Sequence, residues 1–302
     1  MFVLCTAPAQ AFDPIRTWVS ATGSNANTAT ECSLATNPCN DFATALSQTT
    51  ANGVGGEVNC IGPAGDIAGG GSVTITISVT IDCHGTFAGF ITGFPNAFVI
   101  NAPGDVVTIR GLNIDGTNGP NFGGLRGANG VVIEAAAVVN IEDCVIENFT
   151  QSGISVTTSA NTILNVRNST IRNAANGISF APTGGAVNGS IDRTMIAKMS
   201  GNGITTNGGT VFFTVTSSVI ANAAGVGVHS DGAGTVLGID SSSVSNNRTA
   251  FATAGGVIRI SRNVIYDNTT NYSIAGGVIA TAGNNSVAVN GSTVPNGSVT
   301  QQ

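Results

Sequence analysis

The stretch Val166-Arg-Asn-Ser-Thr-Ile171-Arg-Asn173-Ala-Ala-Asn-Gly177-Ile178 decides the fold, because its pattern recurs along most of the chain. The pattern is a β-branched residue, an apolar residue five positions later, an asparagine after two more, and then a glycine-isoleucine step. Equivalent first residues, 23, 28, 32, 25, 25, 24, 24 and 21 positions apart, are Val58, Ile81, Ile109, Ile141, Val166, Ile191, Val215, Ile239 and Ile260. The chain is therefore a tandem repeat with a period of about 24 residues.

Each repeat holds three short strand-forming segments and lacks a helical one. Such a repeat cannot bury its apolar face alone, so successive turns stack at about 4.8 Å and enclose continuous Ile/Val columns, a column being the equivalent residues of successive turns. One column suits a left-handed turn position whose side chains bond from turn to turn: Asn148, Asn173, Lys198, Asn222, Asn246 and Asp267. The sequence predicts an all-β fold, a single-stranded parallel β-helix (solenoid) of about ten turns over residues 57–285.

Composition excludes several other classes of protein. Only 9% of the 302 residues are charged, against about 25% in typical proteins, while 42% are hydrophobic and 41 residues are glycine. Disordered chains are charge-rich and helical bundles need charged outer faces, so neither class fits. The net charge is −6 and Lys198 is the single lysine, which argues against nucleic acid as a partner. No apolar run approaches the ~18 residues of a membrane span, so we expect no membrane insertion.

The N-terminal region indicates export and a cap. Residues 1–11 end in Ala9-Gln10-Ala11, which is typical of a signal-peptide cleavage site, so we interpret them as a signal-peptide remnant and expect a secreted or periplasmic protein. Residues 12–56 form the predicted cap. Its helix, residues 40–50, has Asn40 as N-cap and covers the first turn with Phe42, Ala45, Leu46 and Thr49.

The C-terminal tail, residues 286–302, is rich in Asn, Gly and Ser and has no comparable apolar stripe. An uncovered strand edge pairs readily with another chain. The tail therefore predicts an open end and end-to-end self-association.

Two cysteine pairs fit an oxidising compartment. Six residues separate Cys32 from Cys39 in a proline-containing loop, which predicts a local disulfide. Cys60 and Cys83 are 23 positions apart, one turn of the solenoid, which places their Cα atoms within disulfide range. A bridge and a stack of two buried thiols are both open for this second pair.

The remaining cysteine and the two histidines predict no metal centre. Cys144 shares a column with Ser169, Thr194, Ser218 and Ser242, so we expect it to fill space in the interior. His84 is predicted to be a turn residue. His229 and Asp231 share one outward strand face, either as an exposed polar pair or as an oriented general base. None of these groups has zinc-site spacing.

The repeat pattern resembles the right-handed parallel β-helix proteins of the pectin-lyase-like superfamily over roughly residues 57–285. The segment from Cys32 to Leu46 also resembles the start of secreted bacterial β-helix repeat proteins of this group. The resemblance implies the right hand of the helix. Polygalacturonase-like members carry Asn-Thr-Asp, Asp-Asp, Gly-His-Gly and Arg-Ile-Lys motifs, to which the nearest fragments here are Gly227-Val-His229 and Ile258-Arg-Ile260. The resemblance therefore implies the fold and no inherited activity.

Charged residues form an outward column that reads Asp82, Arg110, Glu142, Arg167, Asp192, Thr216 and Asp240. The sign alternates through its first five members. Each cross-strand ion pair of this kind contributes only about 0.2–1 kcal/mol to the stability of the fold. We interpret the column as a structural ladder, since catalytic clusters concentrate charge of one sign.

A catalytic alternative rests on four carboxylates in two successive turns: Asp115, Glu142, Asp143 and Glu147. Carboxylates one turn apart would stand near the roughly 5 Å separation of a retaining glycosidase pair, where one pKa rises and supplies an acid beside a base. The same cluster is the one candidate for Ca²⁺; no other cofactor is expected. Nearby arginines would neutralise these charges.

Two long excursions from the repeat are candidate ligand sites. Residues 85–105 contain four phenylalanines, and residues 115–130 contain two further candidates, Phe122 and Arg126. With Arg110 and Phe94 these residues form the predicted ligand-binding set. The other interpretation is that the phenylalanines pack onto the flank of the solenoid.

Three functions stay open at this stage. The first is a non-enzymatic surface, matrix or carbohydrate-binding module, with polysaccharide as partner. The second is a polysaccharide hydrolase or lyase that uses the acidic cluster. The third is a structural spacer that self-associates through its C-terminal end.

Overall fold

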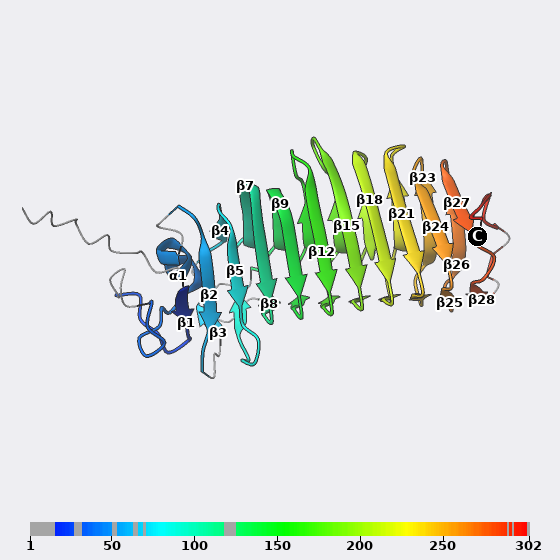
Figure 1. Cartoon of the computed structure of the whole chain (residues 1–302). Coiled ribbons are helices and arrows are strands. Elements are labelled where there is room, and N and C mark those ends of the chain that lie inside the picture. Colours follow the sequence, from blue (N-terminus) through cyan, green and yellow to red (C-terminus); the bar gives the residue numbers. More distant parts are fainter. Residues whose placement is uncertain are drawn as a thin grey trace, which may run out of the picture.

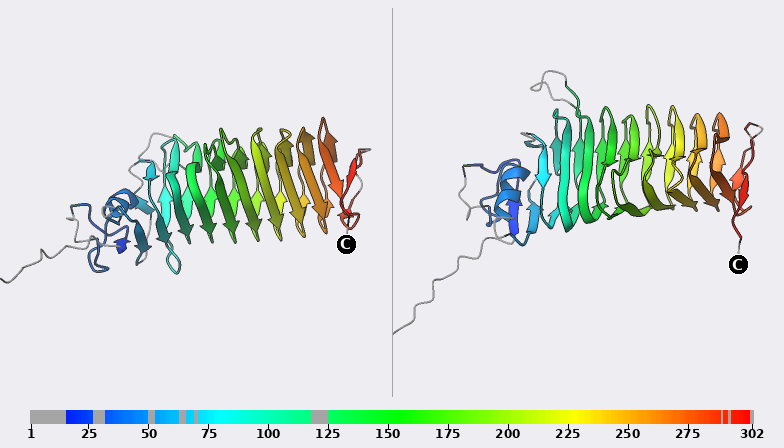
Figure 2. Two further views of the ribbon diagram at one scale, coloured as in Figure 1. Left: turned by 45° about the horizontal axis from the view of Figure 1, so that its top comes forward. Right: turned by 90° about the horizontal axis from the view of Figure 1, so that it is seen from above.

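The computed structural model describes residues 16–26, 32–49, 53–62, 66–68, 71–117, 125–288, 290–291 and 293–300. It is an all-β parallel solenoid of about nine turns with one short helix (Figure 1). The turns stack in a regular row, with the helix at one end and the last strands at the other (Figure 2). The predicted fold class is confirmed. The proposed signal-peptide remnant, residues 1–11, lies outside the described residues.

Each turn has three faces. The first face contains β2 (Gly56–Cys60), β5 (Val79–Asp82), β12 (Thr162–Arg167), β15 (Ala186–Asp192), β18 (Thr210–Thr216), β21 (Thr235–Asp240), β24 (Val257–Ser261) and β27 (Val278–Thr281). The second face contains β3 (Asp66–Ala68), β6 (Gly89–Ile91), β8 (Asn113–Asp115), β10 (Val145–Glu147), β13 (Thr170–Arg172), β16 (Met195–Ala197), β19 (Val219–Ala221), β22 (Ser243–Ser245), β25 (Val264–Tyr266) and β28 (Ser286–Val287). The third face contains β4 (Val73–Ile75), β11 (Ser152–Val156), β14 (Asn176–Phe180), β17 (Ile204–Thr206), β20 (Val226–Asp231), β23 (Thr249–Ala254) and β26 (Thr270–Ile274).

Two long strands join the third face to the first. β7 (Asn96–Arg110) and β9 (Asn129–Glu142) pair with third-face strands along their first halves and with first-face strands along their second halves. Register shifts after Ile100 and after Ala102 mark the corner between the two halves. The first and third faces therefore form one continuous sheet, and the short second-face strands form another.

In-register apolar columns fill the interior. The anchor residues of the first face, from Val58 to Ile260, are at most 1% exposed. On the second face the buried column, all at 0% exposure, is Ile114, Ile146, Ile171, Ile196, Ile220, Val244 and Ile265. Burying each such side chain contributes about 1.5–3 kcal/mol, so these columns are the main stabilising feature of the stack.

Left-handed backbone positions turn the chain at two corners of each turn. The predicted column from Asn148 to Asp267 has φ between 56° and 67°, and Asn173 Nδ2 donates to Asn148 Oδ1 at 3.2 Å. The second set, which the sequence did not reveal, has φ between 46° and 55° and comprises Asp143, Asn168, Arg193, Ser217, Ser241 and Arg262. This second set mixes Asp, Asn, Arg and Ser. The sequence pattern therefore did not predict this second left-handed corner.

Small polar side chains form a ladder inside the corner between the first and second faces. Cys144 N–H donates to Ser169 Oγ at 3.1 Å, and Thr194 N–H donates to Ser218 Oγ at 3.1 Å. Ser218 N–H continues the ladder to Ser242 Oγ at 3.1 Å. Buried amides that face no strand partner are satisfied in this way. The prediction that Cys144 fills the interior is confirmed, and burial raises the pKa of its thiol to about 12.

The N-terminal cap contains one helix and one strand. α1 (Phe42–Thr49) begins one residue later than its predicted cap requires: Asp41 Oδ1, not the side chain of Asn40, accepts the Thr44 N–H at 2.6 Å. Asn40 Nδ2 instead donates to the carbonyls of Ala21 and Gly23. The strand β1 (Arg16–Val19), which we did not predict, pairs in parallel with β2 and extends the first face by one strand.

Phenylalanines pack inside the first turns. Phe42 from α1 meets Phe90 and Phe98, with ring centroids 5.9 Å from each, and the latter two rings lie 4.9 Å apart. All three side chains are at most 1% exposed. Phe90 and Phe98, which belong to the 85–105 excursion, therefore lie in the core and not on the outer flank.

Both predicted cysteine pairs are disulfides. Cys32 is bonded to Cys39, and Cys60 is bonded to Cys83 with Cα atoms 4.6 Å apart. The bridge thus replaces the buried-thiol stack as the description of the second pair. No helix among the described residues is long and apolar enough to cross a membrane.

The predicted tail continues the stack for part of a further turn. β28 pairs with β25, and β29 (Gly297–Ser298) pairs with β27 along the last first-face edge. Asn296 reinforces this contact by donating from Nδ2 to the Gly277 carbonyl at 3.1 Å. The tail therefore covers part of the edge that the sequence left open.

Candidate functional site

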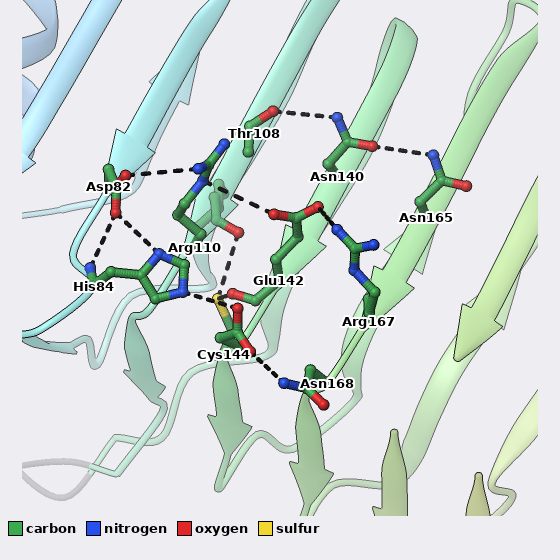
Figure 3. Close-up of polar contacts among 12 residues, drawn as sticks. Asp82, His84, Thr108, Arg110, Asn140, Glu142, Cys144, Asn165, Arg167 and Asn168 are labelled. Carbon is green, nitrogen blue, oxygen red and sulfur yellow. Dashed lines mark hydrogen bonds and ion pairs between the residues drawn. The ribbon is translucent and has the colours of Figure 1, made fainter. Parts of the chain in front are cut away.

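Charged side chains form an axial ladder where the first-face strands end. Strand register places Asp82, Arg110, Glu142, Arg167 and Asp192 side by side in successive turns. Arg110 Nη1 lies 3.7 Å from Asp82 Oδ2, and Arg110 Nε lies 3.9 Å from Glu142 Oε2. Arg167 Nη2 contacts Glu142 Oε1 at 2.8 Å (Figure 3). The alternating ladder that the sequence predicts is present.

Further along the axis, hydroxyl groups and arginines take over as partners of the acidic residues. Thr216 Oγ1 donates to Asp192 Oδ1 at 3.0 Å. Asp240 accepts hydrogen bonds from Ser261, Arg262 and Ser241. Burial raises the pKa of Asp240, but these hydrogen bonds outweigh that effect and leave its pKa below the ordinary value.

An amide and hydroxyl ladder runs beside the charged one. Asn140 Nδ2 donates to Thr108 Oγ1 at 3.2 Å, and Asn165 Nδ2 donates to Asn140 Oδ1 at 3.0 Å (Figure 3). Ser190 Oγ continues it to Asn165 Oδ1 at 3.4 Å. Because each side chain satisfies its neighbour, the whole row is held in one orientation on the surface.

His84 joins the ladder to the corner of the first and second faces. Its Nδ1 lies 3.2 Å from Asp82 Oδ1, and its Nε2 lies 2.8 Å from Asp143 Oδ2 (Figure 3). Asn168 Nδ2 donates to the other oxygen of Asp143 at 2.6 Å. The hydrogen bond from Asn168, with a smaller contribution from His84, holds the pKa of Asp143 below its ordinary value despite partial burial.

The other two predicted catalytic carboxylates lie at the far end of the second-face strands. Strand register aligns Asp115 with Glu147 and Glu147 with Arg172. Arg172 Nε contacts Glu147 Oε2 at 2.7 Å, which raises the pKa of Arg172. Asp115 Oδ1 accepts a hydrogen bond from Asn148 Nδ2 at 2.8 Å and another from Thr117 N–H at 2.7 Å.

The four predicted catalytic carboxylates therefore fall into two separate pairs, one at each end of the second-face strands. Glu142 and Asp143 precede β10, whereas Asp115 and Glu147 end β8 and β10. Each carboxylate accepts hydrogen bonds or ion pairs from neighbouring turns. A general acid needs a raised pKa, and Asp143 is shifted the other way.

The predicted ligand-binding residues also lie at different corners. Arg110 belongs to the charged ladder. Phe94, 41% exposed, and exposed Arg126 lie near the corner between the second and third faces, where Ala128 N–H donates to the Pro95 carbonyl. Phe122 falls outside the described residues. The structure does not gather the three described residues, Arg110, Phe94 and Arg126, into one site.

His229 occupies the predicted outward column of the third face, with its Nδ1 3.3 Å from Thr205 Oγ1. Within the described part of the chain, no group of three or more His, Cys, Asp or Glu side chains is arranged to hold a metal ion. Calcium binding stays an untested prediction.

Sequence reasoning missed two residues of the corner. His84 lies in a turn as predicted, but its contacts with Asp82 and Asp143 were not foreseen, and Phe87 was grouped with the other phenylalanines of the 85–105 excursion. Phe87 is 95% exposed, whereas Phe90 and Phe98 are buried. The sequence signal for this corner was the spacing of 28 positions between Ile81 and Ile109, which exceeds the period of about 24 residues.

Comparison of the chain with protein-family models, with curated proteins and with solved structures found no match. The parallel solenoid of about nine turns supports the likeness to β-helix repeat proteins, and it does so at the level of the fold alone.

Proposed function

We propose that the protein is an exported, non-enzymatic solenoid that binds polysaccharide along its first face. The observation that carries the proposal is the arrangement of outward side chains on that face in three parallel columns. One column is charged and one is hydroxyl and amide, as described above. The third is mainly apolar and comprises Val106, Val138, Ile163, Asn188, Phe212, Val236, Val257 and Val278.

The apolar column is accessible to solvent. Val106, Ile163 and Phe212 are 46%, 45% and 48% exposed. Exposed apolar surface of this extent, bordered by polar groups, is typical of interaction sites. A sugar ring presents C–H groups on its faces and hydroxyl groups at its edges, so an apolar column beside an amide and hydroxyl column matches a chain of such rings laid along the axis.

Charge narrows the class of polysaccharide. The net charge is −6 and the ladder alternates in sign, so a polyanion gains little on this surface. We therefore propose a neutral or weakly charged glycan. Two disulfides support the proposal of an extracellular setting.

The enzymatic alternative is disfavoured by the partners of the four carboxylates. Each accepts a hydrogen bond or ion pair from an adjacent turn, and they are divided between two corners. Such pairing accounts for their positions without a catalytic role.

A glycan-array screen of the full chain, combined with a depolymerisation assay on the same glycans, tests the proposal. Binding without cleavage is the expected result. Phe212→Ser should weaken binding, whereas Tyr266→Ser, which changes a 41%-exposed aromatic residue on the second face, should leave it unchanged. Cleavage of any glycan, or no binding to any, would contradict the proposal.

Self-association through the C-terminal end remains a separate prediction. Sedimentation velocity at increasing protein concentration measures it, and comparison with a chain that lacks residues 284–302 assigns it to that end.

A further inference from the structure

The loop at residues 83–88 is longer than the regular corner between the first and second faces. From β7 to β25 two residues suffice there, as in Gly111–Leu112 between β7 and β8 or Asp143–Cys144 between β9 and β10; the first and last of these corners, 61–65 and 282–285, are also longer. Six residues, 83–88, separate β5 from β6. The loop projects beyond the row of corners as the cyan hairpin below β5 (Figure 1). In solenoids, insertions in single turns commonly carry the binding site.

The loop is fixed at its base by several bonds. Cys83 is disulfide-bonded to Cys60 on β2. His84 bridges Asp82 and Asp143, and Thr86 Oγ1 donates to the Cys83 carbonyl at 2.8 Å. A Cβ atom on Gly111 would stand 2.6 Å from the His84 backbone nitrogen, so this glycine lets the loop lie close to the next turn.

Phe87 stands on this fixed loop with 95% of its surface exposed. A side chain of this size normally gains about 1.5–3 kcal/mol from burial. Other phenylalanines of the same excursion, such as Phe90 and Phe98, obtain that gain in the core. An aromatic ring held out in water by a braced loop is suited to stack against a ligand.

A depression of about 270 Å³ lies beside the loop, with Phe87 at its edge. Its lining residues are Thr86, Phe87, Ala88, Gly89, Gly111, Leu112, Asn113, Asp143 and Val145. Sites for drug-sized ligands measure roughly 300–1,000 Å³, so this one suits a single ring. An aromatic residue beside a few polar groups is the usual composition of a small-molecule site.

Two polar side chains of the depression are available to a ligand. Asn113 is exposed on the second face, one turn before Val145. Asp143 accepts one hydrogen bond at each oxygen, from His84 and from Asn168, and an ionised carboxylate has about four acceptor sites. The same two bonds orient the carboxylate, so its remaining acceptor sites have a defined direction.

We propose that this depression binds one pyranose ring of a neutral glycan. The ring stacks on Phe87, and its hydroxyl groups donate to Asp143 and exchange hydrogen bonds with the Asn113 amide. The inference rests on the proposed polysaccharide-binding function and places a subsite at the N-terminal end of the charged ladder. The Cys60–Cys83 bridge and His84 position the loop that presents the aromatic ring.

Saturation-transfer NMR and calorimetry on the full chain test the subsite. The probes are tetrasaccharides of glucose, mannose, xylose and N-acetylglucosamine. Phe87→Ala should lower the affinity of the bound tetrasaccharide at least tenfold, Asn113→Ala should lower it several-fold, and Phe87→Trp should preserve it. Tyr266→Ala is the matched control on the second face and should leave the affinity unchanged.

The outcomes separate the two proposals. If the wild-type chain binds a tetrasaccharide and Phe87→Ala binds it equally well, the subsite is overturned while polysaccharide binding stands. If the wild-type chain binds no glycan in the array or among the tetrasaccharides, both proposals fail. Because Phe87 is almost fully exposed, circular dichroism of Phe87→Ala should match that of the wild type; a loss of fold would overturn its assignment as a ligand contact.

Discussion

Replacing Arg172 with methionine should destabilise the protein by about 2 kcal/mol, because it leaves Glu147 charged and unpaired in a poorly hydrated position. The Arg172 Nε and Glu147 Oε2 atoms are 2.7 Å apart. The Glu147 side chain is only 11% exposed, whereas that of Arg172 is 43% exposed. Methionine retains much of the apolar stem of arginine, so the loss of charge is the main change.

The magnitude follows from the degree of burial. Breaking a fully buried ion pair costs about 3–5 kcal/mol, and an exposed pair contributes at most about 1 kcal/mol. A charge-assisted hydrogen bond contributes about 1.5–3 kcal/mol. Because Arg172 is partly exposed and Glu147 is nearly buried, the expected cost of Arg172→Met in unfolding free energy lies near the middle of these values. Arg167→Met is the control, since the Arg167 side chain is 53% exposed; its cost should be about 0.5 kcal/mol.

Urea denaturation followed by circular dichroism measures these costs, and hydrogen exchange of the β10 and β13 peptides locates them. Exchange is needed because the turns of a solenoid can unfold in sequence. The double variant Glu147→Gln with Arg172→Met should cost clearly less than the sum of the single changes. If Arg172→Met costs no more than Arg167→Met, or if the two changes are additive, Glu147 is not held by this pair. The structural account of that carboxylate would then be refuted.

Three further predictions concern the corner between the first and second faces. The pKa of Asp143 is lowered in the folded state, so its stabilising contribution is present above the unfolded pKa and is lost as pH falls through the folded value. Asp143→Asn should therefore destabilise the protein at pH 7, and in urea melts this cost should shrink as the pH is lowered below the unfolded pKa. A cost that does not change with pH would contradict the role of the Asn168 hydrogen bond. Cys144, buried with a pKa raised to about 12, should resist iodoacetamide at pH 8 until the chain is unfolded, and mass spectrometry of the native protein checks this. Ser218→Ala removes the acceptor of a buried amide and should cost about 1–3 kcal/mol, against about 0.5 kcal/mol or less for the more exposed Ser243→Ala; equal costs would refute the interior ladder.

Features that repeat in every turn with similar residue types were predictable from the sequence. Val166 and Ile171 recur with fixed spacing because the interior of each turn offers the same two sites. The left-handed corner at Asn173 favours asparagine, which occupies four of the six equivalent positions. Register then follows from the period, which is why the pairing of Glu142 with Arg167 could be predicted before any coordinates.

Features that occur once could not be predicted in this way. β1 extends the first face, but Thr17 stands 41 positions before Val58 and occupies the place of the apolar anchor, so the pairing of β1 with β2 left no periodic trace. The contact between His84 and Asp143 spans 59 positions and depends on how the six-residue loop folds back. The period placed Glu142 and Glu147 in one turn, but it did not show that the second-face strand separates them.

In a solenoid, most side chains contact equivalent residues in the turns above and below, and these contacts explain which residue types occur. Phe212, although exposed, stands in register between Asn188 and Val236, so its column accounts for part of its position. Phe87 lies in an insertion that the two-residue corner of the next turn, Gly111–Leu112, does not match, and it gains little from burial. Neither stacking nor the core therefore explains an aromatic ring there. A contact with another molecule does, which is why the search for a ligand should begin at this loop.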